Sequence, residues 1–189
     1  MESAAVSSPS AFPLELTLPA TGEHFAFRTS ARSGDGTFRF RWTLDAGKKG
    51  PPQHAHPEET ETFAIQSGRL TIWIDGQRAE YGPGDIVPVP PGCTHRFLNA
   101  GTEPVVVEVS LDGPHQEDAL VPMALHLDGR PNPTVGENLR QLVQIVECRG
   151  LSTGSRVADG VAYGLAWILK RFGVRGYGEA RGWDRVWPG

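Results

Sequence analysis

Apolar and polar side chains alternate without exception between residues 37 and 44. Successive side chains of an extended chain point to opposite faces, so this pattern predicts a strand with one buried and one exposed face. The two faces separate apolar from polar side chains: Phe38, Phe40, Trp42 and Leu44 against Thr37, Arg39, Arg41 and Thr43. Similar short segments follow between about residues 14 and 110, separated by turn-forming pairs such as Ser67-Gly68 and Asp75-Gly76. Short, evenly spaced strands predict a mainly β protein, an antiparallel sandwich or barrel.

The pattern changes after Gly113. Residues 137–148 and 155–172 carry apolar side chains at helical spacing, which predicts two helices, and residues 125–133 are expected to form a loop. The apolar stripe of the second helix and two tryptophans near the end of the chain are expected to pack on the barrel or on a partner's barrel: Val157, Val161, Leu165, Ile168, Leu169 and Phe172, with Trp183 and Trp187. We therefore divide the chain into a flexible N-terminus (1–13), a β-barrel (14–113) and a C-terminal helical extension (114–189) that packs on the barrel or on a partner.

Composition narrows the class of protein. Hydrophobic residues make up 39% of the 189-residue chain and charged residues 21%, as in a soluble globular protein. A formal net charge of −4 argues against nucleic acid as a partner. Two cysteines, Cys93 and Cys148, are too few for a disulfide scaffold and fit a reducing compartment. The N-terminus lacks the features of a secretory signal, and the longest apolar run, residues 161–169, is too short to span a bilayer. We expect a cytoplasmic protein that does not bind membranes.

The segment HAHPEETETF carries the strongest chemical signal. His54 and His56 are two residues apart, so both imidazoles leave the same face of an extended chain. Glu61 shares strand parity with Phe63 and Ile65 and should face the barrel interior, whereas Glu58 and Glu59 follow a proline in a polar turn and are expected in solvent. With His95 from a later strand, these side chains can converge on a divalent metal ion.

Two other interpretations remain open for these residues. His54, His56 and His95 can be core histidines that are satisfied by hydrogen bonds, and a buried Glu61 can form a structural ion pair with Arg or Lys. Outside this group, the remaining histidines are expected on the surface or in loops: His24, His115 and His126. Cys93 lies two residues from His95 and could approach the metal, but we favour a plain turn residue without a partner.

Two sequence motifs give the chain a specific resemblance to the cupin superfamily, over about residues 36–112. The first motif is matched in its ligands and its closing glycine: His54, His56, Glu61 and Gly68. The second is matched at every position: Gly84, Pro90, Gly92, His95 and Asn99. The one departure lies upstream, where Lys48, between Gly47 and Gly50, replaces a glycine expected six residues before His54. The two motifs lie in register and are separated by a plausible hairpin.

The resemblance implies a single-domain cupin jelly-roll barrel that binds one divalent metal. The implied ligands are His54, His56, Glu61 and His95, with Glu61 also the candidate catalytic residue; the ion can be Fe, Mn, Ni, Co, Cu or Zn. A metal-dependent enzyme that acts on a small oxygen-rich or aromatic molecule, an oxygenase first of all, is the main hypothesis. The alternatives are a non-redox isomerase or cyclase of a biosynthetic pathway and a non-catalytic small-molecule-binding cupin. The retained ligand set disfavours the last of these.

Further residues are candidates for a substrate pocket. Phe63, Trp73 and Phe97 either line the pocket or fill the barrel. Arg39 and Arg41 could pair with a substrate carboxylate or phosphate if their face looks inward, although a solvated outer face is the simpler interpretation.

The assembly and the role of the helical extension are also open to prediction. Residues 14–31, rich in strand formers, are a candidate for exchange between two chains, so we expect a homodimer. The helical extension either limits access to the metal and shapes the substrate pocket, or it covers an outer face or a dimer contact.

Overall fold

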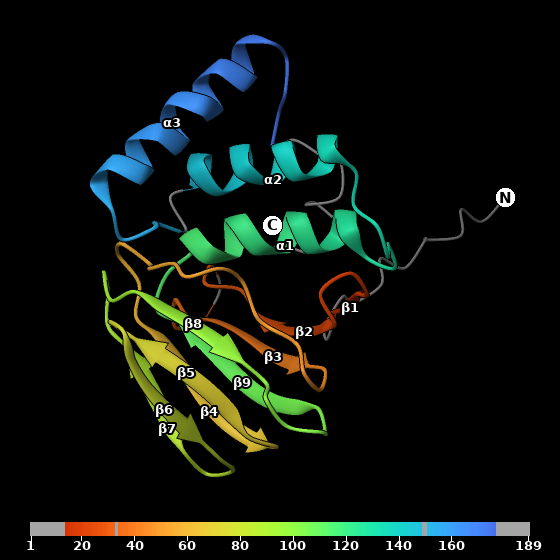
Figure 1. Cartoon of the computed structure of the whole chain (residues 1–189), viewed down its shortest axis with the longest axis vertical. Coiled ribbons are helices and arrows are strands. Elements are labelled where there is room, and N and C mark those ends of the chain that lie inside the picture. The colour runs from red at the N-terminus through yellow and green to blue at the C-terminus, as the bar shows by residue number, and fades with distance from the viewer. Residues whose placement is uncertain (1–13, 33, 149–150, 177–189) are drawn as a thin grey trace, which may run out of the picture.

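Nine strands and three helices make up the part of the chain described by the computed structural model, residues 14–32, 34–148 and 151–176 (Figure 1). The strands are β1 (Leu14–Leu18), β2 (Glu23–Thr29), β3 (Phe38–Leu44), β4 (Glu61–Ser67), β5 (Leu70–Ile74), β6 (Gln77–Tyr81), β7 (Ile86–Val89), β8 (His95–Leu98) and β9 (Val105–Leu111). The helices are α1 (His115–Leu127), α2 (Val135–Cys148) and α3 (Arg156–Arg171). The predictions for residues 1–13, Trp183 and Trp187 lie outside the described residues.

The strands pair antiparallel in two sheets. One has six strands in the order β1-β2-β3-β9-β4-β7, and the other three, β6-β5-β8. The alternation expected for residues 37–44 is present in β3, whose apolar side chains are buried while Arg39 and Arg41 are not. Aromatic contacts join the sheets, since Phe97 on β8 packs against Trp42 on β3 and Phe63 on β4. The prediction of an antiparallel β-barrel followed by helices is confirmed.

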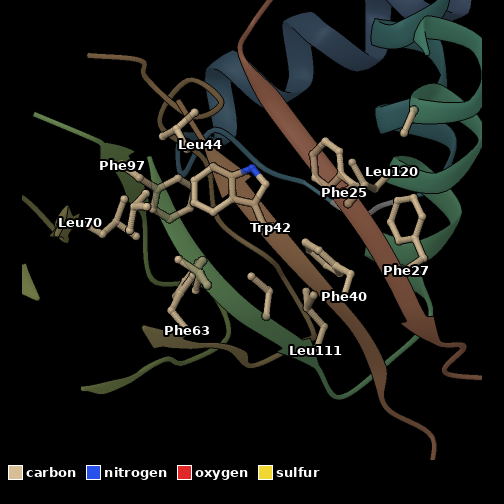
Figure 2. Packing of buried hydrophobic residues seen from close by; sticks show 14 of the residues in the cluster. Phe25, Phe27, Phe40, Trp42, Leu44, Phe63, Leu70, Phe97, Leu111 and Leu120 are labelled. Carbon is tan, nitrogen blue, oxygen red and sulfur yellow. The ribbon is translucent and has the colours of Figure 1, made fainter. Parts of the chain in front are cut away.

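The narrow sheet does not cover all of the wide one, and α1 covers part of the remainder. Phe25 and Phe27 on β2 lie between β3 and α1, with Leu120 of α1 beside them (Figure 2). These side chains and the barrel interior form one continuous apolar core. Burying a side chain such as Phe or Leu is worth roughly 1.5–3 kcal/mol, so α1 is an integral layer of the fold.

The helix α1 was not predicted, and the expected loop over residues 125–133 is wrong for residues 125–127, which end this helix. Two features make this helix hard to predict from the sequence. Buried residues lie on several of its sides, so no single apolar stripe is visible, and Pro122 stands inside it, where proline removes a backbone donor. Asp118, four residues earlier, keeps a partner for its carbonyl, because Gln144 Nε2 of α2 donates to it at 2.7 Å. A side chain from α2 therefore compensates for the proline.

The helices α2 and α3 confirm the two predicted from apolar spacing, but α3 turns a different face inward. Its inward stripe is formed by Asp159, Ala162, Ala166 and Leu169, which are half-buried or buried. Most of the large apolar side chains point outward, with Val161 66% and Phe172 82% exposed. The prediction that this stripe packs on the barrel of its own chain is wrong, because α2 separates α3 from the barrel (Figure 1). Packing on a partner's barrel stays a prediction.

Among the described parts of residues 14–176, no helix is both long enough and apolar enough to cross a bilayer.

Candidate metal centre

The loop before β4 is pinned to the start of β8. His54 and His95 exchange two backbone hydrogen bonds, His54 N to His95 O at 3.0 Å and His95 N to His54 O at 2.7 Å. His54 and His56 lie outside the named strands, in an extended segment with isolated bridges, but they keep the side-chain alternation of a strand. Glu61 opens β4, where its parity with Phe63 and Ile65 directs it inward as predicted.

Four buried side chains converge at this point. His54, His56, Glu61 and His95 each offer one ligand atom, and these atoms all lie within 4.8 Å of one another. Oε2 of Glu61 is 3.1 Å from Nε2 of His56 and 2.9 Å from Nε2 of His95. The sequence motif and the structure thus bring together the same four residues.

Backbone carbonyls orient two of the imidazoles. Nδ1 of His54 donates to Pro52 O at 2.8 Å, and Nδ1 of His95 donates to Cys93 O at 3.1 Å. Each of these nitrogens therefore carries the proton, which leaves Nε2 as a lone-pair donor; such bonds commonly fix the tautomer of a metal-binding histidine. Nε2 of His95 is buried and makes no hydrogen bond of acceptable geometry. Its lone pair faces a carboxylate oxygen, an arrangement that a cation between the two atoms would stabilise.

Burial and neighbouring charges keep His54 neutral and Glu61 ionised, the states in which these two groups bind a metal ion. Burial, reinforced by His95 and His56, lowers the pKa of His54 to about 3. Burial alone would raise the pKa of Glu61, but the neighbouring His56 and His95 together hold that pKa well below its usual range. A neutral imidazole and an ionised carboxylate are the forms that bind a metal ion.

Gly50, near the first motif, and Asn99, of the second motif, act on the backbone around the cluster. Gly50 donates its N–H to Phe97 O at 3.3 Å, and a Cβ at this position would lie 2.6 Å from the Phe97 ring. Because Gly50 has no side chain, its backbone can approach Phe97 closely. Gly50 lies two residues after Lys48, the position that departs from the motif. Asn99 is fully buried, and its Nδ2 donates to the carbonyls of Leu44 and Glu103, both at 2.9 Å. It fastens the end of β8 to β3 and to the following turn.

Of the predicted pocket residues, Phe63 and Phe97 lie beside the cluster. Their ring centroids are 6.3 and 5.4 Å from that of His95, and both side chains are buried. Trp73 does not join them, because its parity on β5 is opposite to that of the inward Ile72, and it stacks under Arg96 at 3.8 Å. The pocket assignment of Trp73 is wrong.

The two arginines of β3 also face away from the barrel interior. Arg39 binds Asp35 at 2.6 Å, and Arg41 binds Glu108 at 2.7 Å. Strand alternation decides this outcome, since Phe40 and Trp42 occupy the buried face. The pocket assignment of Arg39 and Arg41 is therefore wrong, and the simpler interpretation of a solvated face holds.

Cys93 lies in the turn before His95 and is not one of the four clustered residues. Burial and the neighbouring Asp75 raise the pKa of its thiol, which disfavours the thiolate that a metal would bind. Its contribution is the carbonyl that orients His95.

The two acidic residues between His56 and Glu61 differ in their exposure to solvent. Glu58 is exposed as expected and pairs with His115 at 3.3 Å. Glu59, also expected in solvent, is buried: Oε1 accepts from His115 N at 2.7 Å and Oε2 from Gln116 N at 3.0 Å. It caps the free N–H groups at the start of α1, a role that was hidden because α1 itself was not predicted.

The three histidines outside the motif are partly exposed, as expected, but none lies in a loop. His24 is on β2 and contacts Asp45; His115 begins α1; and His126, in the last turn of α1, contacts Glu137 at 3.1 Å.

The helical extension touches the candidate centre at one place that the sequence did not reveal. Ala55, between the two histidines, exchanges backbone hydrogen bonds with Ser152, at 2.7 and 2.8 Å. Asp159 of α3 holds this segment through Ser152 Oγ and Thr153 N, both at 2.7 Å. No residue pattern marks such a single bridge; Ser155 and Asp159 look only like the beginning of a helix.

The barrel consists of two antiparallel sheets, and a buried cluster of three histidines and one glutamate lies near its interior aromatic side chains. These features define the class of protein. Residues 40–112 match the family model described as a cupin domain. The matched part of the chain contains the whole cluster, and the match confirms the resemblance drawn from the motifs.

Individual similarities are more limited. Over 44 residues the chain is 41% identical to quercetin 2,3-dioxygenase of Bacillus subtilis, a match that covers 23% of this chain and only 13% of that enzyme. Among solved structures, a sugar phosphate isomerase from Silicibacter pomeroyi has 23% identity and a TM-score of 0.45, covering 49% of this chain and 60% of the other. A predicted oxalate decarboxylase from Thermotoga maritima has 19% identity and a TM-score of 0.47, covering 55% and 94%.

Proposed function

We propose that the protein is a metal-dependent cupin enzyme that holds one divalent transition metal and acts on a small molecule. The supporting observation is the cluster itself. The Nε2 lone pair of buried His95 faces the carboxylate of Glu61, and two carbonyls fix the tautomers of His54 and His95. A structural ion pair or a set of satisfied core histidines would not leave a buried acceptor facing another acceptor.

The donor set fits Fe, Mn, Ni, Co, Cu or Zn, for which imidazole and carboxylate are suitable ligands. When bound, such an ion supplies Lewis acidity and, if it is redox-active, oxygen chemistry at positions that the protein leaves open. Glu61 brings negative charge to the site and is the candidate catalytic residue. Phe63 and Phe97 cover the cluster from the barrel interior and exclude water, which strengthens electrostatic interactions there.

Oxygenase chemistry is the specific activity that we propose, and the local similarity to quercetin 2,3-dioxygenase supports it. The test is elemental analysis of protein purified without added metal or chelator, with oxygen-electrode assays on phenolic and diketone compounds. One redox-active ion per chain, with oxygen uptake on at least one compound, is expected. Stoichiometric zinc without oxygen uptake would instead support a non-redox isomerase or cyclase, because zinc does no redox chemistry. Absence of any metal would leave a non-catalytic binding protein.

A further inference from the structure

A cavity of about 580 Å³ lies between the barrel and the helical extension. The barrel side is formed by β1, β2 and the loop that leads to His54, and the helical side by all three helices. In Figure 1 the helices stack over one side of the sheets, with α1 nearest to them. Clefts and cavities of this size typically hold one drug-sized molecule.

His54 belongs both to this cavity and to the candidate metal centre. Its Nδ1 is engaged by Pro52 O, and Pro51, Pro52 and Gln53 line the cavity with it. A molecule held in the cavity therefore touches the loop that carries the first ligand, and His54 is the point where the two sites meet.

The cavity lining is largely apolar, and its charged groups have partners. Among the described lining residues, Arg130 is the single arginine or lysine, and it pairs with Glu137. Asp159 accepts from Ser152 and Thr153, and Glu23 accepts from Trp42 Nε1 at 3.2 Å. Burial raises the pKa of Glu23, which favours its neutral form. Nothing in this lining matches a phosphate or carboxylate group.

Gln116, on the first turn of α1, lines the cavity, and its Oε1 is buried beside it and accepts no hydrogen bond. A buried acceptor without a donor is unfavourable, so a ligand donor that the Gln116 side chain turns to meet gains an interaction that the empty protein lacks.

We propose that this cavity binds a neutral, largely apolar small molecule, whose hydroxyl or N–H group donates to Gln116 Oε1. The identification of this molecule as the substrate rests on the proposed function, because it requires the ion beside His54; binding in the cavity does not.

The test uses N-phenyl-1-naphthylamine, a neutral aromatic probe with one N–H donor, in fluorescence titrations of the full chain, as purified and after chelation. Ala162→Trp fills the cavity from α3, whereas Val161→Trp, its exposed neighbour, is the matched control. Ala162→Trp should weaken probe binding by about tenfold or more, and Val161→Trp should leave it within about twofold. Equal binding by wild type and Ala162→Trp would place the probe on the exposed face of α3 and overturn the proposal.

A second variant tests the polar contact independently. Gln116→Leu removes the unpaired acceptor, so thermal stability without probe should stay equal or rise while probe affinity falls by about tenfold. A fall in stability with unchanged affinity would contradict the assigned contact. Fructose 6-phosphate should not displace the probe, and displacement would overturn the assignment of a neutral ligand.

The two proposals can fail separately. Probe binding that responds to Ala162→Trp in a protein without stoichiometric metal would end the proposed function and keep the cavity. Stoichiometric metal without probe binding would end the cavity proposal alone.

Discussion

His95 is the residue at which the candidate metal centre can be tested most directly. Its side chain is buried, and its Nε2 faces Glu61 without a hydrogen bond. We expect His95→Ala to lose most of the bound metal, measured by elemental analysis of protein purified in parallel with wild type. Glu58→Gln, with the changed side chain 61% exposed, is the control and should retain the metal. Full occupancy in a His54→Ala/His95→Ala double variant would refute the ligand assignment.

Glu59 allows a prediction about the stability of the fold rather than about metal binding. Its two carboxylate oxygens each accept one N–H at the start of α1, and glutamine retains only one acceptor. Glu59→Gln should therefore destabilise the metal-free protein by about 1 kcal/mol, by analogy with the loss of a helix cap. Urea unfolding in the presence of a chelator measures this effect. Unchanged stability together with lost metal would mean that Glu59 acts on the cluster instead.

The ligands were predictable from sequence because alternation fixes which side chains share a face. His54, His56 and Glu61 could be placed without knowledge of any distant contact. The same rule placed Phe63 inside and left Arg39 on the opposite face from the core. Glu59 could not be placed, because its burial depends on a helix that begins 56 residues later in the chain.

At the scale of elements, α1 depends on the contact between Gln144 and the carbonyl that Pro122 leaves without its helical partner. Gln144→Leu should destabilise the protein by about 1 kcal/mol, because a part-buried carbonyl loses its donor. In a Pro122→Ala background, residue 122 can donate to the carbonyl of Asp118, so the same substitution should have a smaller effect. Chemical denaturation of the four proteins forms a double-mutant cycle. Equal effects in both backgrounds would contradict this account.

Glu137 links the start of α2 to the end of α1, through Thr134 N at 2.6 Å, His126 Nε2 at 3.1 Å and Arg130. The Thr134 backbone N–H, with these neighbours, lowers the pKa of Glu137 to about 2. A depressed carboxyl pKa stabilises the fold above the ordinary value of 4.5 and ceases to do so as the pH falls towards 2.

Glu137→Gln should therefore lower the thermal unfolding midpoint at pH 7, and the difference from wild type should narrow at about pH 3. Parallel melts of the two proteins at both pH values measure this. A difference that widens on acidification would show that the ionised form of Glu137 is not the stabilising one.

The strands and two of the helices could be predicted from the sequence, because one face of each differs from the other in polarity. The helix α1 was not, since buried residues on several sides give it no stripe. The inward face of α3 was misjudged for a related reason. Apolar side chains indicate burial only where a surface lies near enough to cover them, and α3 packs on α2 rather than on the barrel, with Ala166 turned inward.

At the scale of the whole molecule, a homodimer remains our prediction. Exchange through β1 is less favourable than the sequence suggests, because the outer edge of this strand is partly covered by its own chain. Thr17 N donates to Asp128 Oδ1 at 2.7 Å, and Gly129 N donates to Thr17 O at 2.8 Å. Light scattering at micromolar concentration should give about twice the chain mass of 20.5 kDa. A mass equal to that of one chain would reject the dimer.

The bridge between Ala55 and Ser152 would link binding of the proposed ion thermodynamically to docking of the helical extension. Ala55 lies between two of the proposed ligands, so any order that a bound ion imposes on this loop also favours docking of the Ser152 segment, and docking favours the ion by the same free energy. The extension then acts as an allosteric effector carried on the same polypeptide. A molecule bound in the cavity beneath the helices would then change the affinity of the protein for the ion without coordinating the ion itself.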